Sequence, residues 1–510
     1  APGASIRNYR VLWGGSGTLA RILAAMEMAV RDKVDVVSMS IGSTYGHPDT
    51  PRARAIDNVV LAGIVFVCSN GNNGPVERTT GGYAQSQLAI SVGNADARMK
   101  QFFSHGTGQT HLARLFTYSP QLDELEGQTF EYVDCGYGGY LSDFYEDGIV
   151  EEGRSLVEGK VALVSRGGPS GATSFYLKHD NARDAGAVAV IVYNNVPDGV
   201  VSGTIYNDGD IPIIGISQVD GQLLKAQSNK TIEFSNDSYV VMNNGSSRGP
   251  TSMLDIKPDV SAPGTVVIAA VPFPAEGEEP VSGATQRENG GWYANLSGTS
   301  MATPQVAGAA AILRQAYPHW TPEQVKLALM NTAVDIKQEN GQSYRPIDQG
   351  AGLINVMRAL KTQLFIKPGS LSFRDAAVEE LTKNVTLESI SNETNSYEIR
   401  VAMHNPENQY RILLADEVEL KAGETKTLPI TLEIDPTLPP SVLGESEYCG
   451  YIYFINKNNP DDYYRLPYHF VYQQPVSQFT VAPDYMSLNP EATQRTVTFT
   501  YTLGSDVHDV

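Results

Sequence analysis

Cysteine is scarce in this chain, which has three cysteines in 510 residues. They stand far apart, at Cys68, Cys135 and Cys449, and three thiols cannot all be paired within one chain. Cys68 lies in an apolar strand pattern that predicts a buried thiol. The sequence does not decide whether Cys135 and Cys449 form a disulfide bond. The sequence is therefore not that of a disulfide scaffold.

Basic side chains are also few. The sequence has 37 lysines and arginines against 57 aspartates and glutamates, for a formal net charge of −20. This excess of negative charge disfavours nucleic acid and anionic membrane surfaces as partners. Long hydrophobic runs are absent as well, and no segment has the roughly 20 apolar residues of a membrane-spanning helix. What remains is a globular chain long enough for several domains.

The most informative motif that is present is the run GTSMATP at residues 298–304, followed by a helix-forming stretch at 305–317. Pro318 predicts the end of this helix, because proline cannot continue one. Ser300 would then lie where the helix begins, beside unpaired backbone N–H groups and the positive end of the helix dipole, which stabilise a developing oxyanion. Serine and threonine are also ordinary helix caps, but the length of the run favours a nucleophile.

This run resembles the nucleophile motif of the subtilisin-like serine proteases, the subtilases. The resemblance implies an α/β fold, a subtilisin-like three-layer sandwich with a parallel sheet. It also implies a secreted serine endopeptidase that hydrolyses peptide bonds in proteins, with Ser300 as the nucleophile. Residues 247–250, 257–264 and 349–355 resemble further segments of the family and are expected to serve the fold.

A second motif lies upstream, where the apolar run 64–68 continues into SNGNNGP at 69–75. This pattern predicts a buried strand that ends in a glycine-rich turn. It resembles the segment that carries the oxyanion-hole asparagine of the family, and the flanking glycines assign that role to Asn72. Asn-Gly pairs are also common turn formers, but the motif around Ser300 favours the catalytic role. The neighbouring residues expected at the substrate are Ser69, Asn70 and Gly71.

Residues 35–42, with the sequence DVVSMSIG, form another hydrophobic segment that ends in small residues. They resemble the strand edge of the family that pairs with an extended substrate through main-chain hydrogen bonds. The substrate-binding residues implied are Ser40, Ile41 and Gly42. A plainer reading is a strand that ends in a Ser-Gly turn. Gly81 and Gly82 resemble the floor of the pocket for the side chain that precedes the scissile bond.

The partners of the nucleophile are not identified in the chain. The family carries its triad in the order Asp, His, Ser. The opening APGA resembles the turn that follows both Asp and His, so we expect a fragment that begins after them and is inactive by itself. Residues 104–108, SHGTG, mimic a histidine motif but follow the oxyanion segment, so His105 is not expected to be the base. The alternative is a catalytically inactive homologue that acts as a peptide-binding or adhesive module.

Composition changes along the chain predict its domains. We expect the catalytic domain in two pieces, residues 1–112 and 241–362. The strand, helix, strand pattern of the intervening residues 113–240 resembles a protease-associated domain. Residues 364–475 alternate short strands and turns and resemble a fibronectin-type β-sandwich, and 476–510 are expected to begin a further, truncated β-rich module.

No cofactor is assigned. Subtilases often bind structural calcium, but no ligand spacing here supports a site. Protein or peptide substrates are the expected partners, and an extracellular location, secreted or at the cell surface, rests on the resemblance. Six Asn-X-Ser/Thr sequons would suit glycosylation of a secreted protein, although such short patterns also arise by chance. They begin at Asn229, Asn236, Asn244, Asn295, Asn384 and Asn392.

Overall fold

A computed structural model describes most of the chain. The described residues are 3–13, 15–43, 46–105, 109–151, 153–169, 174–197, 199–205, 210–274, 281, 284–286, 290–338, 341–376, 379–404, 409–441, 447–472, 479–482 and 500–503. The side chains of residues 98–102, 109, 236–239, 479–482 and 500–503 are not among what is described.

The chain divides into two compact units. We call residues 97–240 the insert unit, and residues 1–96 together with 241–510 the larger unit. Strands β3 (Ile90–His105) and β9 (Thr231–Met242) each contribute residues to both units. The predicted boundary of the insert at residue 113 falls inside β4 (Gln109–Leu115).

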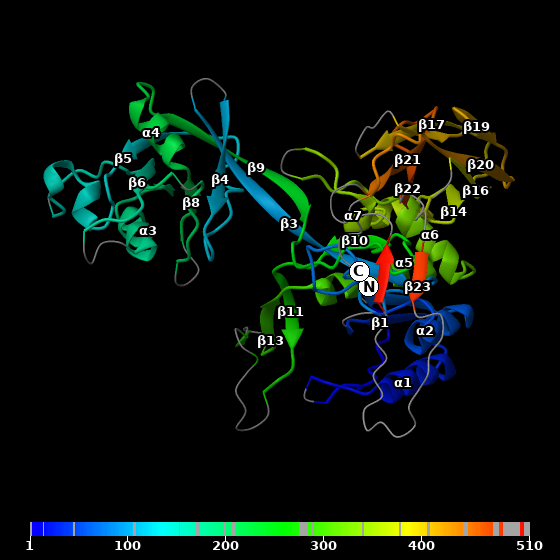
Figure 1. Cartoon of the computed structure of the whole chain (residues 1–510). Coiled ribbons are helices and arrows are strands. Elements are labelled where there is room, and N and C mark those ends of the chain that lie inside the picture. The colour runs from blue at the N-terminus through cyan, green and yellow to red at the C-terminus, as the bar shows by residue number, and fades with distance from the viewer. Residues whose placement is uncertain are drawn as a thin grey trace. The chain divides into compact units, whose positions relative to one another are not determined.

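Parallel strands form the central sheet of the larger unit (Figure 1). They are β1 (Val36–Met39), β2 (Val65–Ser69), the first part of β3, and β10 (Val260–Pro263). They pair in the order β1, β2, β3, β10, and every pairing is parallel. The side chains of β2 are buried along its whole length, as expected for a strand covered on both faces.

Helices cover both faces of this sheet. They are α1 (Leu19–Arg31), α2 (Pro51–Leu61), α5 (Thr299–Ala316) and α6 (Pro322–Asn331). Side chains alternate along a strand, so Phe66 and Cys68 of β2 pack with α1 and α2, whereas Val65 and Val67 pack with α5 and α6. The predicted α/β arrangement, with helices on either side of a parallel sheet, is confirmed.

Small side chains on the buried face of α5 explain its close packing against the sheet. Four of the buried side chains that α5 presents to the core are alanines, at positions 302, 307, 309 and 310. Small side chains let a helix approach a sheet closely, and α5 contacts β1, β2 and β10. The other elements of this part are β11 (Val267–Val271), β12 (Thr285–Gln286), β13 (Trp292–Leu296), α7 (Pro346–Gln349) and α8 (Val356–Leu360).

The insert unit is an α/β structure with its own two hydrophobic clusters. Its strands pair in the order β4, β8, β7, β6, β5, β9, and the inner four are parallel. Its elements besides β4 and β9 are β5 (Thr129–Asp134), η1 (Leu141–Phe144), η2 (Glu146–Gly148), β6 (Val161–Ser165), α3 (Phe175–Asp184), β7 (Ala189–Tyr193), β8 (Ile213–Ile216) and α4 (Gln218–Ala226).

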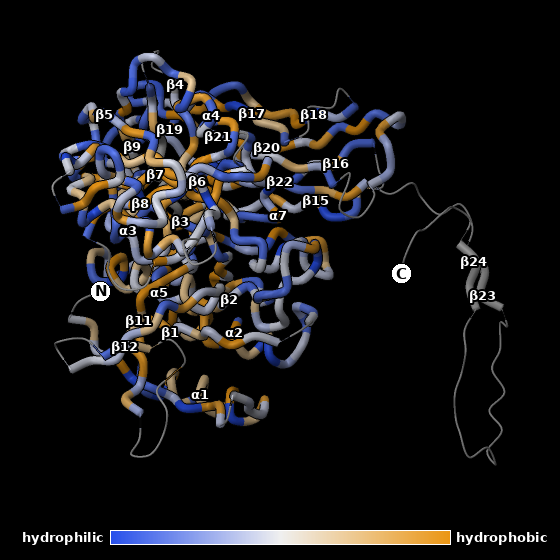
Figure 2. Tube along the Cα trace, turned by 90° about the vertical axis from the view of Figure 1, so that its left-hand side faces the viewer, coloured by the Kyte–Doolittle hydropathy of each residue, from blue (hydrophilic) through white to orange (hydrophobic). Residues whose placement is uncertain are grey.

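Two sheets form a β-sandwich in residues 364–471. One sheet contains β14 (Leu364–Lys367), β16 (Glu380–Ser389), β20 (Thr425–Ile434) and β18 (Tyr410–Leu413). The other contains β15 (Leu371–Asp375), β22 (Tyr463–Val471), β21 (Tyr448–Asn456), β17 (Asn395–Met403) and β19 (Glu417–Leu420). Buried and exposed residues alternate along β20, and Figure 2 shows the corresponding alternation of hydropathy. The alternating residues enclose one hydrophobic core between the sheets.

In residues 476–510 the structure describes only the backbone of β23 (Phe479–Ala482) and β24 (Thr500–Leu503), which pair antiparallel. The rest of that predicted module lies outside the described residues. Within the described part of the chain, the helices fall short of the length and hydrophobicity needed to cross a bilayer. All three cysteines are free and buried, so the bridge between Cys135 and Cys449 does not form. Burial raises the pKa of the Cys68 thiol to about 12.

Candidate active site

The predicted site residues meet at the carboxyl end of the parallel sheet. Ser40 follows β1, Asn72 lies in the turn after β2, and Gly264 follows β10. Parallel strands end on the same edge of a sheet, so their connecting loops come together there. The backbone carbonyl of Gly264 accepts a hydrogen bond of 2.8 Å from the N–H of Gly298, which precedes α5. The start of α5 is thereby fixed beside the strand ends.

Ser300 is the second residue of α5 and is partly exposed. Gly298 caps the helix with a φ of 146°, a backbone conformation that favours glycine. The first N–H groups of a helix have no partner inside it, so the N–H of Ser300 is available to a ligand. No described residue forms a hydrogen bond with the side-chain oxygen of Ser300. The predicted nucleophile therefore stands at a helix start with its hydroxyl accessible.

Asn72 contacts the residue next to Ser300. Its Oδ1 accepts hydrogen bonds from the backbone N–H of Thr299 at 3.0 Å and from the hydroxyl of Thr299 at 2.8 Å. Both contacts use the carbonyl side of the amide, which is only an acceptor. The NH₂ group of Asn72 is consequently left to donate elsewhere, beside the start of α5. The structure thus brings together the two residues that the sequence analysis named as nucleophile and oxyanion donor.

The carbonyl of Ser300 has an unusual partner. In a regular helix it would accept from the backbone N–H of residue 304, but Pro304 has none. The hydroxyl of Ser40 donates to this carbonyl instead, at 2.7 Å. Ser40 thus supplies the hydrogen bond that Pro304 removes from α5, and it ties the end of β1 to the first turn of the helix.

We expect Ser40→Ala to lower the free energy of unfolding by about 0.5 to 1 kcal/mol, because the Ser300 carbonyl loses its donor at a site that water reaches. In a Pro304→Ala background the restored N–H can serve that carbonyl, so Ser40→Ala should cost less there. Denaturant unfolding of the two single variants and the double variant measures this coupling. Ser38→Ala, on the exposed face of β1, is the matched control. Equal losses of unfolding free energy in the two backgrounds would contradict the role of the hydrogen bond from Ser40 to the Ser300 carbonyl.

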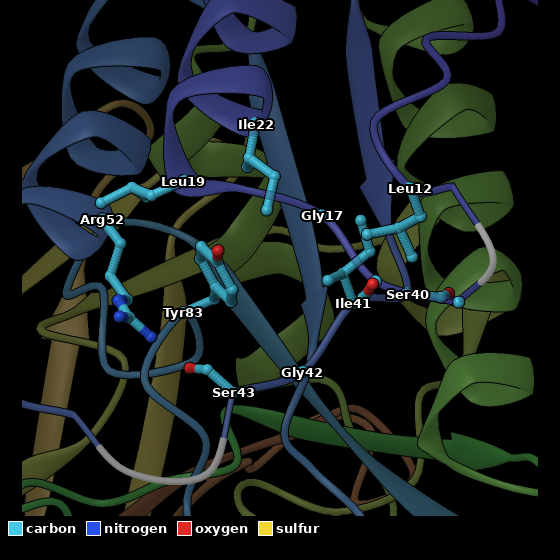
Figure 3. A pocket seen from close by; sticks show the side chains of 12 residues that line it. Leu12, Gly17, Leu19, Ile22, Ser40, Ile41, Gly42, Ser43, Arg52 and Tyr83 are labelled. Carbon is cyan, nitrogen blue, oxygen red and sulfur yellow. The ribbon is translucent and has the colours of Figure 1, made fainter.

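The other predicted substrate residues lie either in the wall of a cavity or in the turn that carries Asn72. Ile41 and Gly42, with Ser40, line a cavity of about 450 Å³. Figure 3 shows Leu12 and Ile41 on one side of this cavity and Arg52 and Tyr83 on the other, with Ile22 above. The guanidinium of Arg52 lies 5.4 Å from the ring centre of Tyr83. The further lining residues are Gly15, Ser16, Gly17, Leu19 and Ser43.

Asn70 and Gly71 hold the turn that carries Asn72. The side chain of Asn70 is fully buried, where its Nδ2 donates to the Ser247 carbonyl at 2.7 Å and its Oδ1 accepts from the Ser91 hydroxyl at 2.8 Å. Gly71 has a φ of 117°, and a Cβ there would lie 2.6 Å from Oγ of Ser247. The turn therefore requires glycine at this position. Ser69, also buried, ends β2, and the backbone N–H of Gly81 donates to the Asn70 carbonyl at 2.8 Å.

The described histidines have contacts away from Ser300. In the insert unit, Nε2 of His105 lies 3.2 Å from Nε2 of His111, whose Nδ1 lies 2.8 Å from Asp220. Burial and the neighbouring His111 lower the pKa of His105. His469 pairs with Glu447 at 2.9 Å in the β-sandwich. Residues 106–108 of the SHGTG run, like the Ala1 and Pro2 of the opening turn, lie outside the described residues.

A buried ionic cluster supports the sheet near the site. Asp259, before β10, is 3% exposed and contacts Nζ of Lys257 at 2.6 Å and Nζ of Lys326 at 2.9 Å. Its Oδ2 also accepts from the backbone N–H of Ser91 at 2.7 Å. Burial alone would raise the pKa of Asp259, but the two ammonium groups outweigh burial and hold it below its usual value. Residues 257–264 are predicted from the sequence to serve the fold, but their pattern does not reveal this cluster, because Lys326 lies on α6.

Comparison with known proteins identifies a matching family and related sequences. Residues 1–352 match the model of the subtilase family. The minor extracellular protease Vpr of Bacillus subtilis (strain 168) is 35% identical over 421 residues, which are 79% of this chain and 49% of that protein. The subtilisin-like protease SBT1.2 of Arabidopsis thaliana is 29% identical over 408 residues, which are 76% of this chain and 50% of that protein.

The chain therefore spans about half the length of the curated relatives it matches. Among solved structures, that of the psychrophilic subtilisin-like protease Apa1 from the Antarctic psychrotroph Pseudoalteromonas sp. AS-11 is 20% identical. The match covers 68% of this chain and 74% of that one with a TM-score of 0.28. The family match covers well over half of the chain and includes the GTSMATP run, Asn72 and the parallel sheet. The chain belongs to the subtilase family.

Proposed function

We propose that the full-length protein is a secreted serine endopeptidase in which Ser300 attacks the carbonyl carbon of a peptide bond. The NH₂ group of Asn72 and the N–H of Ser300 donate hydrogen bonds to the oxyanion that forms. The observation that carries this proposal is the pair of hydrogen bonds from Thr299 to Asn72, which orients the amide beside the nucleophile. Donors fixed in advance stabilise the transition state without any cost of reorganisation.

Proton transfer from Ser300 requires a general base. The described residues place no histidine within hydrogen-bond distance of its hydroxyl. We propose that the histidine and the aspartate of the triad come from residues that precede Ala1 in the full-length protein. The 510-residue chain by itself is then expected to lack efficient peptidase activity.

The substrate in this proposal is an extended peptide that lies along residues 40–42. The end of β1 offers backbone groups to the main chain of a peptide, which binds largely independently of its side chains. The adjoining cavity presents the apolar side chains of Leu12, Ile22 and Ile41. It is therefore suited to an apolar side chain of the substrate.

The remaining parts receive proposals of their own. The α/β architecture of the insert unit supports its assignment as a protease-associated domain that either binds substrate or spaces the chain. The two-sheet architecture of residues 364–471 supports a fibronectin-type module.

Glycosylation suits an extracellular protein. The sequon residues Asn229, Asn244, Asn295, Asn384 and Asn392 are exposed, whereas the side chain of Asn236 is not described. No calcium site is assigned, and the melting temperature with and without a calcium chelator tests whether the protein binds structural calcium as many subtilases do.

Covalent labelling tests the proposed nucleophile. A fluorophosphonate probe added to the full-length protein should label it at Ser300, and Ser300→Ala should abolish the label. Ser38→Ala is the matched control, because its hydroxyl lies on the exposed face of β1 and is not proposed to react. Absence of labelling in the full-length protein, together with peptide binding, would favour the alternative of an inactive peptide-binding homologue. Labelling that persists in Ser300→Ala would refute the assignment.

A further inference from the structure

The loop of residues 70–82, which carries Asn72, is held by residues far away in the sequence. Its inner side is fixed by residues 245–249, since the backbone N–H of Asn73 donates to the hydroxyl of Ser247 at 3.0 Å and that of Thr79 donates to the carbonyl of Arg248 at 3.0 Å. The loop also carries two charged residues in succession, Glu77 and Arg78. Each of these two residues pairs with a residue from a different part of the larger unit.

Glu77 is bound by the catalytic part of the larger unit. Its buried carboxylate pairs with the guanidinium of Arg345, which also binds Asp348 through two hydrogen bonds of 3.0 and 3.1 Å. This segment is itself fixed by the β-sandwich, because the hydroxyl of Tyr451 on β21 donates to the carbonyl of Gly350 at 3.0 Å. A charge network therefore joins the loop to residues 345–350 and, through them, to the sandwich.

Arg78 is bound by the sandwich directly. Its guanidinium donates to Oε1 of Glu447 at 3.3 Å, and Oε2 of Glu447 lies 2.9 Å from Nε2 of His469. The side chains of Glu447 and His469 are 1% and 0% exposed, so this carboxylate is presented to the loop from inside the sandwich. A buried carboxylate held by a buried imidazole has little freedom to follow a moving partner.

The backbone of Arg78 shows that the loop depends on such contacts. Arg78 has a φ of 58°, in the left-handed region that residues with a Cβ rarely adopt. Its N–H donates to the carbonyl of Gly249 at 2.9 Å while its side chain reaches Glu447. Such a conformation persists only when the surrounding structure imposes it. Removal of the Glu447 charge should therefore let this part of the loop relax.

We propose that Glu447 and His469 of the β-sandwich are positioning residues for proteolysis, because they fix Arg78 and with it the loop that aims Asn72 at the oxyanion. This inference rests on the proposed function. It makes the sandwich a part of the active-site support. The sandwich would then be more than a separate module attached to the protease.

The test uses Glu447→Gln, which keeps the shape of the side chain and its acceptor for His469 but removes the charge that faces Arg78. In the full-length protein we expect kcat for a peptide substrate to fall about tenfold with KM nearly unchanged, since the loop acts on the transition state. Amide hydrogen exchange in residues 70–82 should rise about tenfold at a temperature well below unfolding. Arg78→Gln should give the same effects, and the double variant should be no worse than either single one.

The control is Arg374→Gln. Arg374 of β15 binds Asp255 at 3.0 Å, so this pair also joins the sandwich to the rest of the larger unit, but it does not touch the loop. An exposed pair of this kind should change kcat and loop exchange by less than about twofold. Equal effects in the Glu447 and Arg374 variants, or unchanged loop exchange in Glu447→Gln, would overturn the inference. A full-length protein without Ser300-dependent activity would instead refute the proposed function, whatever the exchange data show.

Discussion

Asn72→Ala is expected to lower kcat of the full-length protein about 10² to 10³-fold, the magnitude known for the corresponding donor of subtilisin, a member of the same family. KM should change little, because the amide would bind the oxyanion of the transition state and not the planar carbonyl of the substrate. Steady-state kinetics with a chromogenic peptide measures both parameters.

Two further variants separate donation from packing. Asn72→Asp keeps an oxygen that can accept from Thr299 but has no NH₂ group, so it should lose as much activity as Asn72→Ala. Asn73→Ala is the matched control, since Asn73 is the exposed neighbour whose backbone N–H makes the described contact with Ser247. Wild-type kcat in Asn72→Asp would show that the amide contributes only packing.

Asp259→Asn is expected to destabilise the protein by about 3 to 5 kcal/mol, the usual cost of removing one partner from a buried ion pair. The variant would leave the ammonium groups of Lys257 and Lys326 together in the interior without the carboxylate that both contact. Urea unfolding at pH 7 measures the loss. Glu398→Gln, which breaks an exposed pair with Arg400, is the control and should leave the unfolding midpoint unchanged. A midpoint for Asp259→Asn close to that of wild type would contradict this account.

The same carboxylate predicts a pH dependence. The pKa of Asp259 is lower in the folded protein than in the unfolded chain, where it is about 3.9. The contribution of the Asp259 carboxylate to the free energy of unfolding is therefore complete above the pKa of the unfolded chain. It is lost as the pH falls through the lower pKa of the folded protein. Between pH 5 and pH 2.5 the free energy of unfolding should decline more steeply in wild type than in Asp259→Asn. Parallel curves for the two proteins would refute this origin of acid sensitivity.

Local patterns in the sequence were sufficient for the elements of the site. The run around Ser300 predicted a helix start, and the apolar segment before residue 69 predicted a buried strand with Asn72 in the turn after it. The helix was expected at residues 305–317, whereas α5 is Thr299–Ala316 and includes Pro304. A proline in a helix is usually excluded by its missing N–H, and here the Ser40 hydroxyl, 260 residues away in the sequence, provides the missing hydrogen bond.

Contacts between distant segments could not be predicted in this way. Thr299 and Asn72 are 227 residues apart, and neither local composition nor periodicity indicates that their side chains meet. The same holds for the charges on the loop of residues 70–82, whose partners Arg345 and Glu447 belong to other parts of the fold. Residues 247–250 were assigned a role in the fold, but the two hydrogen bonds of the Arg248 guanidinium, to the carbonyls of Asp348 and Asn243, appear only in three dimensions.

The ion pair between Arg78 and Glu447 also bears on how the protein is made, because its partners are 369 residues apart in the chain. At typical rates of synthesis, the ribosome needs roughly 20 to 75 s to proceed from one partner to the other. During that time the loop around Asn72 lacks one of its supports, and contacts of such long sequence separation form late and slowly. A nascent chain would therefore complete this loop only after the sandwich strands have emerged, so the turn that carries Asn72 gains its last support late in synthesis.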